Sequence, residues 1–164
     1  MAPEQRSRSA ILSGAKIVIA EVGSYESNMV DISARAQVSR ATVYNHFADK
    51  EEMMLSLLES ELNRLAALAK KQPSPKEALF ALSRDISTDP ALRKMVETDP
   101  EDIAHFVTKT DHPLWKLADQ LSAKVFGEQN GDLVLHWLLS QIGAPLSEPQ
   151  SRHQSDQLAR TLSQ

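Results

Sequence analysis

The chain of 164 residues contains no cysteine. Disulfide frameworks, cysteine-ligated zinc sites and thiol nucleophiles are therefore excluded. No stretch approaches about 18 consecutive apolar residues, so the sequence predicts no membrane span. The N-terminal segment MAPEQRSRSA lacks the apolar centre of a signal peptide, and we expect a cytoplasmic protein.

Glycine is also scarce, at five residues, and Val, Ile and Tyr form no alternating runs of the kind that strands require. Leucine and alanine dominate instead, within an ordinary apolar fraction of 41%. This composition favours an all-α fold. The length fits one domain of ordinary size, or a small module joined to a second one.

Positive charge is in deficit, since the net charge is −4, which by itself argues against a nucleic-acid-binding protein. The charge is unevenly distributed, however. From Gln5 to Lys50 there are six basic and four acidic residues, so the acidity lies in the rest of the chain. A mildly basic head on an acidic body suits a protein that contacts an anion with one end only.

The first half of the chain has the periodicity of four helices. Apolar residues three and four apart predict a helix over about 7–22, which Gly23 ends. A short second helix follows, capped by Ser27 or Asn28 and ending near Ala36. Ser39 is a natural N-cap for a third helix. A long fourth helix is expected from 49 to about 71, where an Asp and a Glu three residues later form a capping-box pattern.

Prolines divide the second half into further helices. Ser74 followed by Pro75 and Glu77 predicts a capped helix start, and the order of polar cap and proline then recurs. Helices are also expected over 114–126, 132–142 and 151–162, which together suggest an antiparallel bundle with short links. The recurrences are Thr88-Asp89-Pro90, Thr98-Asp99-Pro100 and Asp111-His112-Pro113.

The segment QVSRATVYNHF, residues 37–47, concentrates hydrogen-bonding side chains on one short helix. Two short helices around a tight turn form the helix-turn-helix geometry, whose second helix enters the DNA major groove. Arg40 and Asn45 could then donate to base edges, while Ala41 allows close approach. Spacing alone leaves open the alternative of a solvated amphipathic helix that packs without binding anything.

The stretch MVDISARAQVSRATVYNHFADKEEMM resembles the DNA-binding domain of the tetracycline-repressor (TetR) family, and the similarity extends over about residues 8–60. Gln37 stands where the family has a turn glycine, and glutamine there would cost about 1 kcal/mol if the backbone is left-handed. Ser33 replaces a small alanine. The positions that fall on the family pattern are Ile32, Ala36, Val38, Ser39, Thr42, Val43, Tyr44, His46, Phe47, Lys50 and Glu51.

The resemblance implies which residues contact DNA. Arg40, Ala41, Thr42 and Asn45 would face bases, while the flanking polar side chains would contact phosphates. Arg6 or Arg8 could add arm contacts. The full predicted set is Ser27, Asn28, Ser39, Arg40, Ala41, Thr42, Tyr44, Asn45, His46 and Lys50.

It also implies two domains: a three-helix helix-turn-helix domain at residues 1–49, and a helical effector-binding and dimerisation domain at 50–164. The fourth helix would act as a lever between them. The segment Leu133–Ile142 is apolar over more than one stripe, so we expect it to pair with a second subunit together with Ser151–Leu162, although burial within one chain is the alternative. An unknown small-molecule effector is expected, with candidate contacts at His105, Phe106, Trp115 and Trp137.

No catalytic triad, phosphate loop or dinucleotide fingerprint is recognisable, so we expect no enzyme, no cofactor and no metal site. The sequence therefore predicts a homodimeric regulator, a ligand-released repressor that binds a palindromic DNA operator. The alternative is a helical ligand-binding or scaffolding protein that has lost DNA binding; a small helical enzyme is a third, more distant hypothesis.

Overall fold

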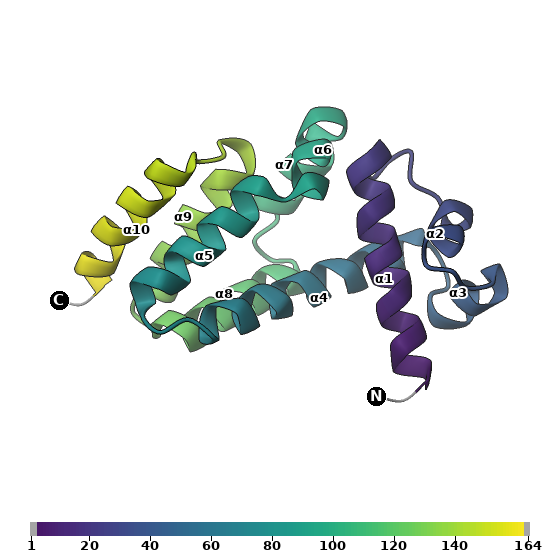
Figure 1. Cartoon of the computed structure of the whole chain (residues 1–164), viewed down its shortest axis with the longest axis horizontal. Helices are drawn as coiled ribbons and strands as arrows, with labels where there is room; N and C mark the ends of the chain where they lie inside the picture. Colours follow the sequence, from purple (N-terminus) through teal and green to yellow (C-terminus); the bar gives the residue numbers. More distant parts are fainter. Residues whose placement is uncertain (1–2, 163–164) are drawn as a thin grey trace. The chain divides into compact units, whose positions relative to one another are not determined.

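The computed structural model of the chain describes residues 3–162, and over that range it contains ten α-helices and no strand (Figure 1). The all-α prediction is confirmed. The chain divides into two compact units. The first contains the residues up to Ser60 together with Pro90–Ala104, and the second contains Glu61–Asp89 together with the residues from His105 onward. No helix within 3–162 has the length and apolar content that crossing a bilayer requires.

Six helices contribute to the first unit, and two of them continue into the second. In the first unit α1 packs against α2, α3 and α6, and α2 packs against α3. In the second, α8 packs on α9, and α5 packs on both α9 and α10. The helices are α1 (Pro3–Val22), α2 (Met29–Arg35), α3 (Arg40–His46), α4 (Lys50–Lys70), α5 (Pro75–Thr88), α6 (Pro90–Thr98), α7 (Pro100–Thr108), α8 (Pro113–Phe126), α9 (Gly131–Gly143) and α10 (Glu148–Leu162).

Local signals account for most helix ends. Gly23 follows α1 with a φ of +90°, a left-handed conformation that suits glycine. Asn28 caps α2 by accepting hydrogen bonds from the backbone N–H groups of Val30 and Asp31. Ser74 caps α5 in the predicted way. α1 begins earlier than expected, at Pro3, because its solvated first turn adds no apolar residue to the periodicity that defined the prediction.

The turn between α2 and α3 is closed by two backbone hydrogen bonds. Val38 N–H donates to the carbonyl of Ser33 at 3.1 Å, and Gln37 N–H donates to that of Ala34 at 3.2 Å. This pairing is the Schellman motif, which requires a left-handed residue at the Gln37 position. Gln37 has a φ of +56° and is the one non-glycine residue with a positive φ among residues 3–162. The strained backbone that the missing glycine suggested is therefore present.

The core of the first unit extends beyond the three predicted helices. Met53 and Leu57 of α4 are buried in it, and so is Ala91 of α6. The predicted boundary lay between residues 49 and 50, whereas the compact unit continues to Ser60 and takes in residues 90–104. The physical reason is that α4 is one uninterrupted helix whose first turns carry apolar side chains into this core.

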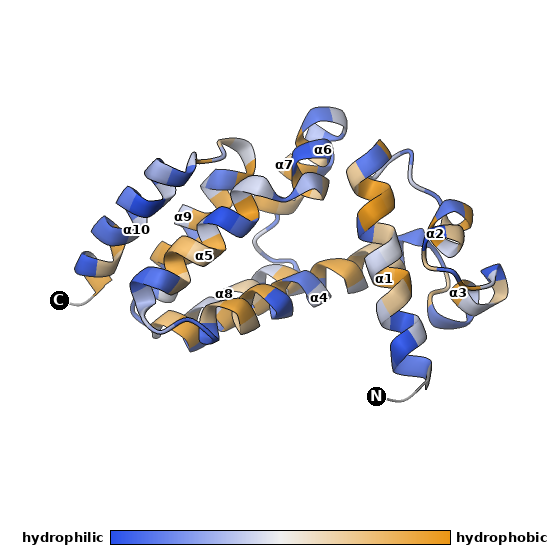
Figure 2. Cartoon of the chain, viewed as in Figure 1, coloured by the Kyte–Doolittle hydropathy of each residue, from blue (hydrophilic) through white to orange (hydrophobic). Residues whose placement is uncertain are grey.

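The second unit has a polar seam between α5, α9 and α10. The buried Oγ of Ser83 lies 2.6 Å from Gln141 Oε1 and 2.8 Å from Ser151 Oγ. α9 is mostly apolar in Figure 2 and α10 mostly hydrophilic. α10 is therefore held to α5 by the buried Ser83–Ser151 hydrogen bond and by an ion pair between Lys76 and Asp156 at 2.7 Å. At the other side, a Cβ on Gly131 would lie 2.6 Å from the backbone N of Ala123, so glycine permits the close contact of α8 and α9.

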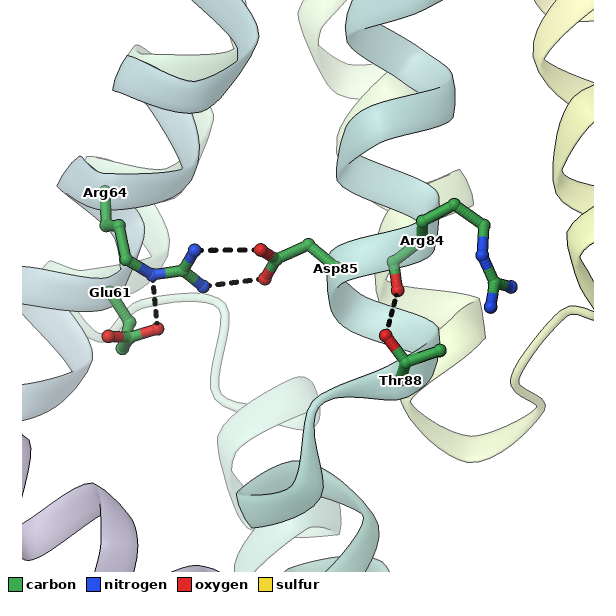
Figure 3. A network of polar contacts seen from close by, with 5 residues as sticks. All are labelled: Glu61, Arg64, Arg84, Asp85 and Thr88. Atoms are coloured by element: carbon green, nitrogen blue, oxygen red, sulfur yellow. Dashed lines mark hydrogen bonds and ion pairs between the residues drawn. The ribbon is translucent and has the colours of Figure 1, made fainter.

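Ionic contacts join α4 and α5 within the second unit (Figure 3). Arg64 donates two hydrogen bonds to Asp85, at 2.8 and 2.6 Å, and a third to Glu61 at 2.8 Å. The hydrogen bonds to Asp85 raise the pKa of the Arg64 guanidinium above its ordinary value, although partial burial opposes the shift.

Candidate nucleic-acid interface

α3 exposes a polar face and buries an apolar one. Val43 and Phe47, four residues apart, are almost fully buried, as the spacing predicted. Arg40, Ala41 and Asn45 are exposed on the opposite side. Side chains that can donate to base edges are therefore presented to solvent, on a helix that the core holds in place.

Tyr44 and His46 complete this face. Tyr44 is 55% exposed, so its hydroxyl and much of its ring are open to a partner. His46 is half-buried, with its ring centroid 6.2 Å from that of Phe47. The structure thus places both predicted phosphate-contacting residues at the surface of the first unit.

Ser39 and Thr42 are linked to each other at the start of α3. Ser39 Oγ accepts a hydrogen bond from Thr42 N–H at 3.0 Å, which is the predicted N-cap, and lies 2.8 Å from Thr42 Oγ1. One of the two hydroxyls donates to the other, so only one hydroxyl proton of the pair is available to an outside partner. The pair can still accept from or donate to DNA, but as a unit.

Arg8 is engaged within the first unit. Its guanidinium lies 5.0 Å from the centroid of the Phe47 ring and donates to Ser56 Oγ at 3.0 Å. A cation over an aromatic face is a stabilising contact. Arg8 therefore braces the end of α3 against α4, a role that the sequence gave no signal for, whereas Arg6 is exposed.

Ser27 and Asn28 serve the loop before α2. Ser27 is only 3% exposed, and its hydroxyl donates to the carbonyl of Ser24 at 2.6 Å. Asn28 remains exposed, but its Oδ1 caps α2 and its Nδ2 donates to Asp31 Oδ2 at 2.7 Å. In this structure both predicted phosphate contacts have internal partners, and the Ser27 side chain is covered.

Lys50 also has internal partners. Its Nζ donates to three backbone carbonyls, those of Ser24 at 2.8 Å, Tyr25 at 2.9 Å and Ser27 at 2.8 Å. An ammonium group carries three N–H donors, so this set satisfies it completely. The predicted phosphate contact would require Lys50 to leave the loop that it holds.

Asp99 binds the same loop from its N–H side, and the sequence did not point to it. Its carboxylate accepts hydrogen bonds from the N–H groups of Ser24 at 2.8 Å and Tyr25 at 3.3 Å. Burial raises the pKa of Asp99, but hydrogen bonds from Thr98, Ser24 and Tyr25 outweigh it and hold the pKa below the ordinary value. The local sequence could not reveal this contact. Asp99 precedes Pro100, and an aspartate before a proline is common at the start of a helix.

The four candidate effector contacts fall into separate groups in the second unit. Trp115 is buried and donates from Nε1 to the carbonyl of Phe106 at 2.8 Å. Trp137 instead donates to Gln154 Oε1 of α10 at 2.9 Å. His105 is exposed on α7. The structure brings Phe106 and Trp115 together, while Trp137 is engaged with α10.

The apolar segment of α9 is largely buried within the chain. Val134, Leu135, Leu138 and Ile142 all belong to the core, whereas Leu133 is 48% exposed. The apolar residues of α9 that suggested a second buried face are thus partly buried within the second unit itself. Leu135, for example, packs against Trp115. The surface left for a partner is narrower than the sequence indicated and centres on Leu133.

Comparisons with known proteins agree with this geometry. Residues 11–57 match the model of the bacterial regulatory proteins of the tetR family. The HTH-type transcriptional repressor Rv1474c of Mycobacterium tuberculosis (strain ATCC 25618 / H37Rv) is 29% identical over 83 residues, which are 51% of this chain and 42% of that protein. The chain therefore aligns with less than half the length of that curated relative.

Solved structures of transcriptional regulators share the fold over nearly the whole chain. The TetR family repressor AlkX from Dietzia sp. strain DQ12-45-1b has a TM-score of 0.69 at 16% identity, covering 94% of this chain and 96% of AlkX. The regulator FadR from Bacillus subtilis, solved with stearoyl-CoA, has a TM-score of 0.54 at 17% identity, covering 94% and 96%. Residues 11–57 therefore match the DNA-binding region of the tetR family of bacterial regulatory proteins, as the helix-turn-helix pattern predicted.

Proposed function

We propose that this chain represses transcription by binding double-stranded DNA with α3 in the major groove. The observation that carries the proposal is that α3 and its C-cap have a buried side, Val43 and Phe47, and an exposed side bearing Arg40, Tyr44 and Asn45. A recognition helix needs such a division, because its apolar side fixes its orientation while its polar side meets base edges and phosphates. The location would be cytoplasmic, where a bacterial operator lies.

We order the proposed DNA contacts by whether each side chain is exposed or already hydrogen-bonded within the protein. Arg40, Ala41 and Asn45 would face bases, with the Ser39–Thr42 pair at the same end of the helix. Tyr44 and His46 would contact phosphates. Ser27, Asn28 and Lys50 support the surface from beneath or beside it, since each is engaged by its own loop.

A dimer would supply the second reading head. One helix-turn-helix recognises few base pairs, whereas two heads about 34 Å apart meet both half-sites of a palindrome. The segments Leu133–Ile142 and Ser151–Leu162 remain our candidates for the interface, through the exposed side of α9 around Leu133. Closed two-fold pairing is the commonest way in which identical subunits associate.

A small-molecule effector would release the repressor from DNA. A ligand shifts the equilibrium only by its difference in affinity for the DNA-binding and non-binding states. The structure of Bacillus subtilis FadR in complex with stearoyl-CoA supports an organic effector for this chain. In this chain Phe106 and Trp115, which lie together, are stronger candidates for ligand contacts than His105 and Trp137.

A second candidate function is a ligand-binding or scaffolding protein without DNA binding. It is favoured by the internal engagement of Ser27, Asn28 and Lys50, and by the exposed acidic Asp31 beside the Asn28 cap. Selection of bound duplexes from a genomic fragment library, followed by gel shift over a range of salt, separates the two. We expect a specific complex that weakens steeply with salt. Failure to enrich any duplex over a non-specific control would overturn the repressor proposal.

A further inference from the structure

The loop of residues 23–27, between α1 and α2, is held on its carbonyl side by a single lysine. Lys50 Nζ lies within 2.9 Å of the carbonyl oxygens of Ser24, Tyr25 and Ser27. Three carbonyls converging on one ammonium resemble the coordination of a bound cation. Since Lys50 is also the first residue of α4, the loop is tied directly to that helix.

The N–H side of the same loop is held by the junction of α6 and α7. Asp99 accepts from the N–H groups of Ser24 and Tyr25, and Asp102 Oδ2 accepts from Ser24 Oγ at 2.9 Å. Thr98 and Asp99 lie so close to Gly23 that no side chain fits there. A Cβ on Gly23 would lie 2.3 Å from Thr98 Oγ1 and 2.5 Å from Asp99 Oδ2. The loop therefore lies between the ammonium group of Lys50 and the carboxylate of Asp99, each of which binds the loop backbone.

We propose that Lys50 and Asp99 form a loop clamp that positions α2 and α3 for DNA recognition, with Lys50 contributing no phosphate contact of its own. The inference rests on the proposed DNA-binding function. It deepens that function by naming two positioning residues, one of which lies about fifty positions beyond the helix-turn-helix in the sequence.

The clamp acts on α3 through a short, rigid path. The loop runs through the buried Ser27 into the Asn28 cap of α2. α2 is then joined to α3 by the Schellman turn at Gln37 and the Ser39 cap. Every link is hydrogen-bonded, so a loosened loop shifts the start of α2 and thereby the base-reading side chains of α3.

Two features distinguish positioning from a direct phosphate contact. A lysine that neutralises a phosphate contributes about 0.9 to the slope of log affinity against log salt, and its loss weakens binding to all sequences alike. A positioning lysine leaves the slope unchanged, and its loss weakens specific binding more than non-specific binding, because only base contacts depend on the fine placement of α3.

The test uses Lys50→Met, Asp99→Asn and the double variant, with Lys70→Met and Asp119→Asn as controls at exposed positions. Affinities are measured by fluorescence anisotropy for a duplex selected with the wild-type protein and for a scrambled duplex, over a salt series. Urea unfolding identifies conditions in which every variant is folded. We expect each clamp variant to lose about tenfold on the selected duplex, the equivalent of one charge-assisted hydrogen bond. We also expect an unchanged salt slope and little loss on the scrambled duplex.

The double variant adds a second criterion. Both residues hold the same loop, so replacing one of them should already loosen it. The loss of affinity in the double variant should therefore be smaller than the sum of the losses in the two single variants. Equal losses on both duplexes with a smaller slope for Lys50→Met would make Lys50 a phosphate contact and overturn the clamp. Lower stability with unchanged affinity of the folded protein would make the residues merely structural and also overturn it. If the wild-type protein selects no duplex, the proposed function itself fails, and the clamp has nothing to position.

Discussion

Arg64 of α4 and Asp85 of α5 face each other through two parallel hydrogen bonds of 2.8 and 2.6 Å. Their side chains are 41% and 25% exposed, so water screens the pair. We predict that Asp85→Asn lowers the free energy of unfolding by no more than about 1 kcal/mol, and by less in high salt. Urea unfolding at low and high salt measures this, with Asp119→Asn as the control. A salt-independent loss of several kcal/mol would show that the pair is far better shielded than its exposure indicates.

Gln37 is strained, and replacing it should stabilise the protein. With a φ of +56°, Gln37→Gly is expected to raise the free energy of unfolding by about 1 kcal/mol, because glycine adopts left-handed backbone without steric cost. Gln37→Ala is the matched control, since alanine keeps the Cβ and should gain little. Chemical denaturation gives both values. Equal stabilisation by alanine would locate the effect in the glutamine side chain and not in the backbone.

Asp99 should make the first unit sensitive to acid. Its folded pKa lies below the ordinary value of 3.8, so its contribution to stability is complete above that pH and is lost as the pH falls through the folded pKa. We predict that the wild-type protein loses more stability than Asp99→Asn between about pH 6 and pH 3. Urea midpoints at several pH values test this, and parallel losses in the two proteins would contradict it.

Sequence preference should depend on Arg40 and Asn45. Each is exposed on the polar side of α3, and replacing a true base contact with alanine should cost about 1–3 kcal/mol and relax preference at one base pair. Selection of random duplexes by each variant gives the preference position by position. Unchanged preference in both Arg40→Ala and Asn45→Ala would mean that another face reads the DNA.

Dimerisation should depend on Leu133 and not on the buried leucines of α9. Charge at Leu135 or Leu138, which are in the core, would disrupt folding before it could report on an interface. Leu133→Arg should instead give a folded monomer in sedimentation velocity, under conditions in which we expect the wild-type protein to be a dimer. Leu55→Arg, at a leucine 39% exposed on α4, is the control and should remain dimeric. A wild-type monomer at micromolar concentration would overturn the proposed interface and the palindromic operator together.

The parts of the molecule that the sequence predicted are those determined by neighbours along the chain. Asn28 and Ser39 cap helices through donors two and three residues away, so their role is visible in a short window. The buried side of α3 follows from the four-residue spacing of Val43 and Phe47. The bounds of α3, its exposed side chains and the similarity of residues 11–57 to the tetR family could therefore be predicted from the sequence.

The parts that the sequence did not predict depend on distant partners. A lysine that follows a helix-turn-helix pattern predicts a phosphate contact. Only the fold shows that Lys50 donates instead to the carbonyls of Ser24, Tyr25 and Ser27. Asp99 is separated from Ser24 by 75 positions. Likewise, apolar residues on two sides of α9 predict two buried faces, but not that α5 and α8 bury most of them within one chain.

The first unit is built from two stretches of chain, the residues up to Ser60 and Pro90–Ala104, with Glu61–Asp89 running through the other unit between them. The first unit is therefore not encoded by one continuous segment that could be exchanged as a whole. A single recombination crossover after the helix-turn-helix would exchange the body and discard Asp99 and Ala91, which the loop and the core of the head require. A single crossover therefore cannot exchange the second unit alone, because the chain leaves the first unit after Ser60 and returns to it at Pro90.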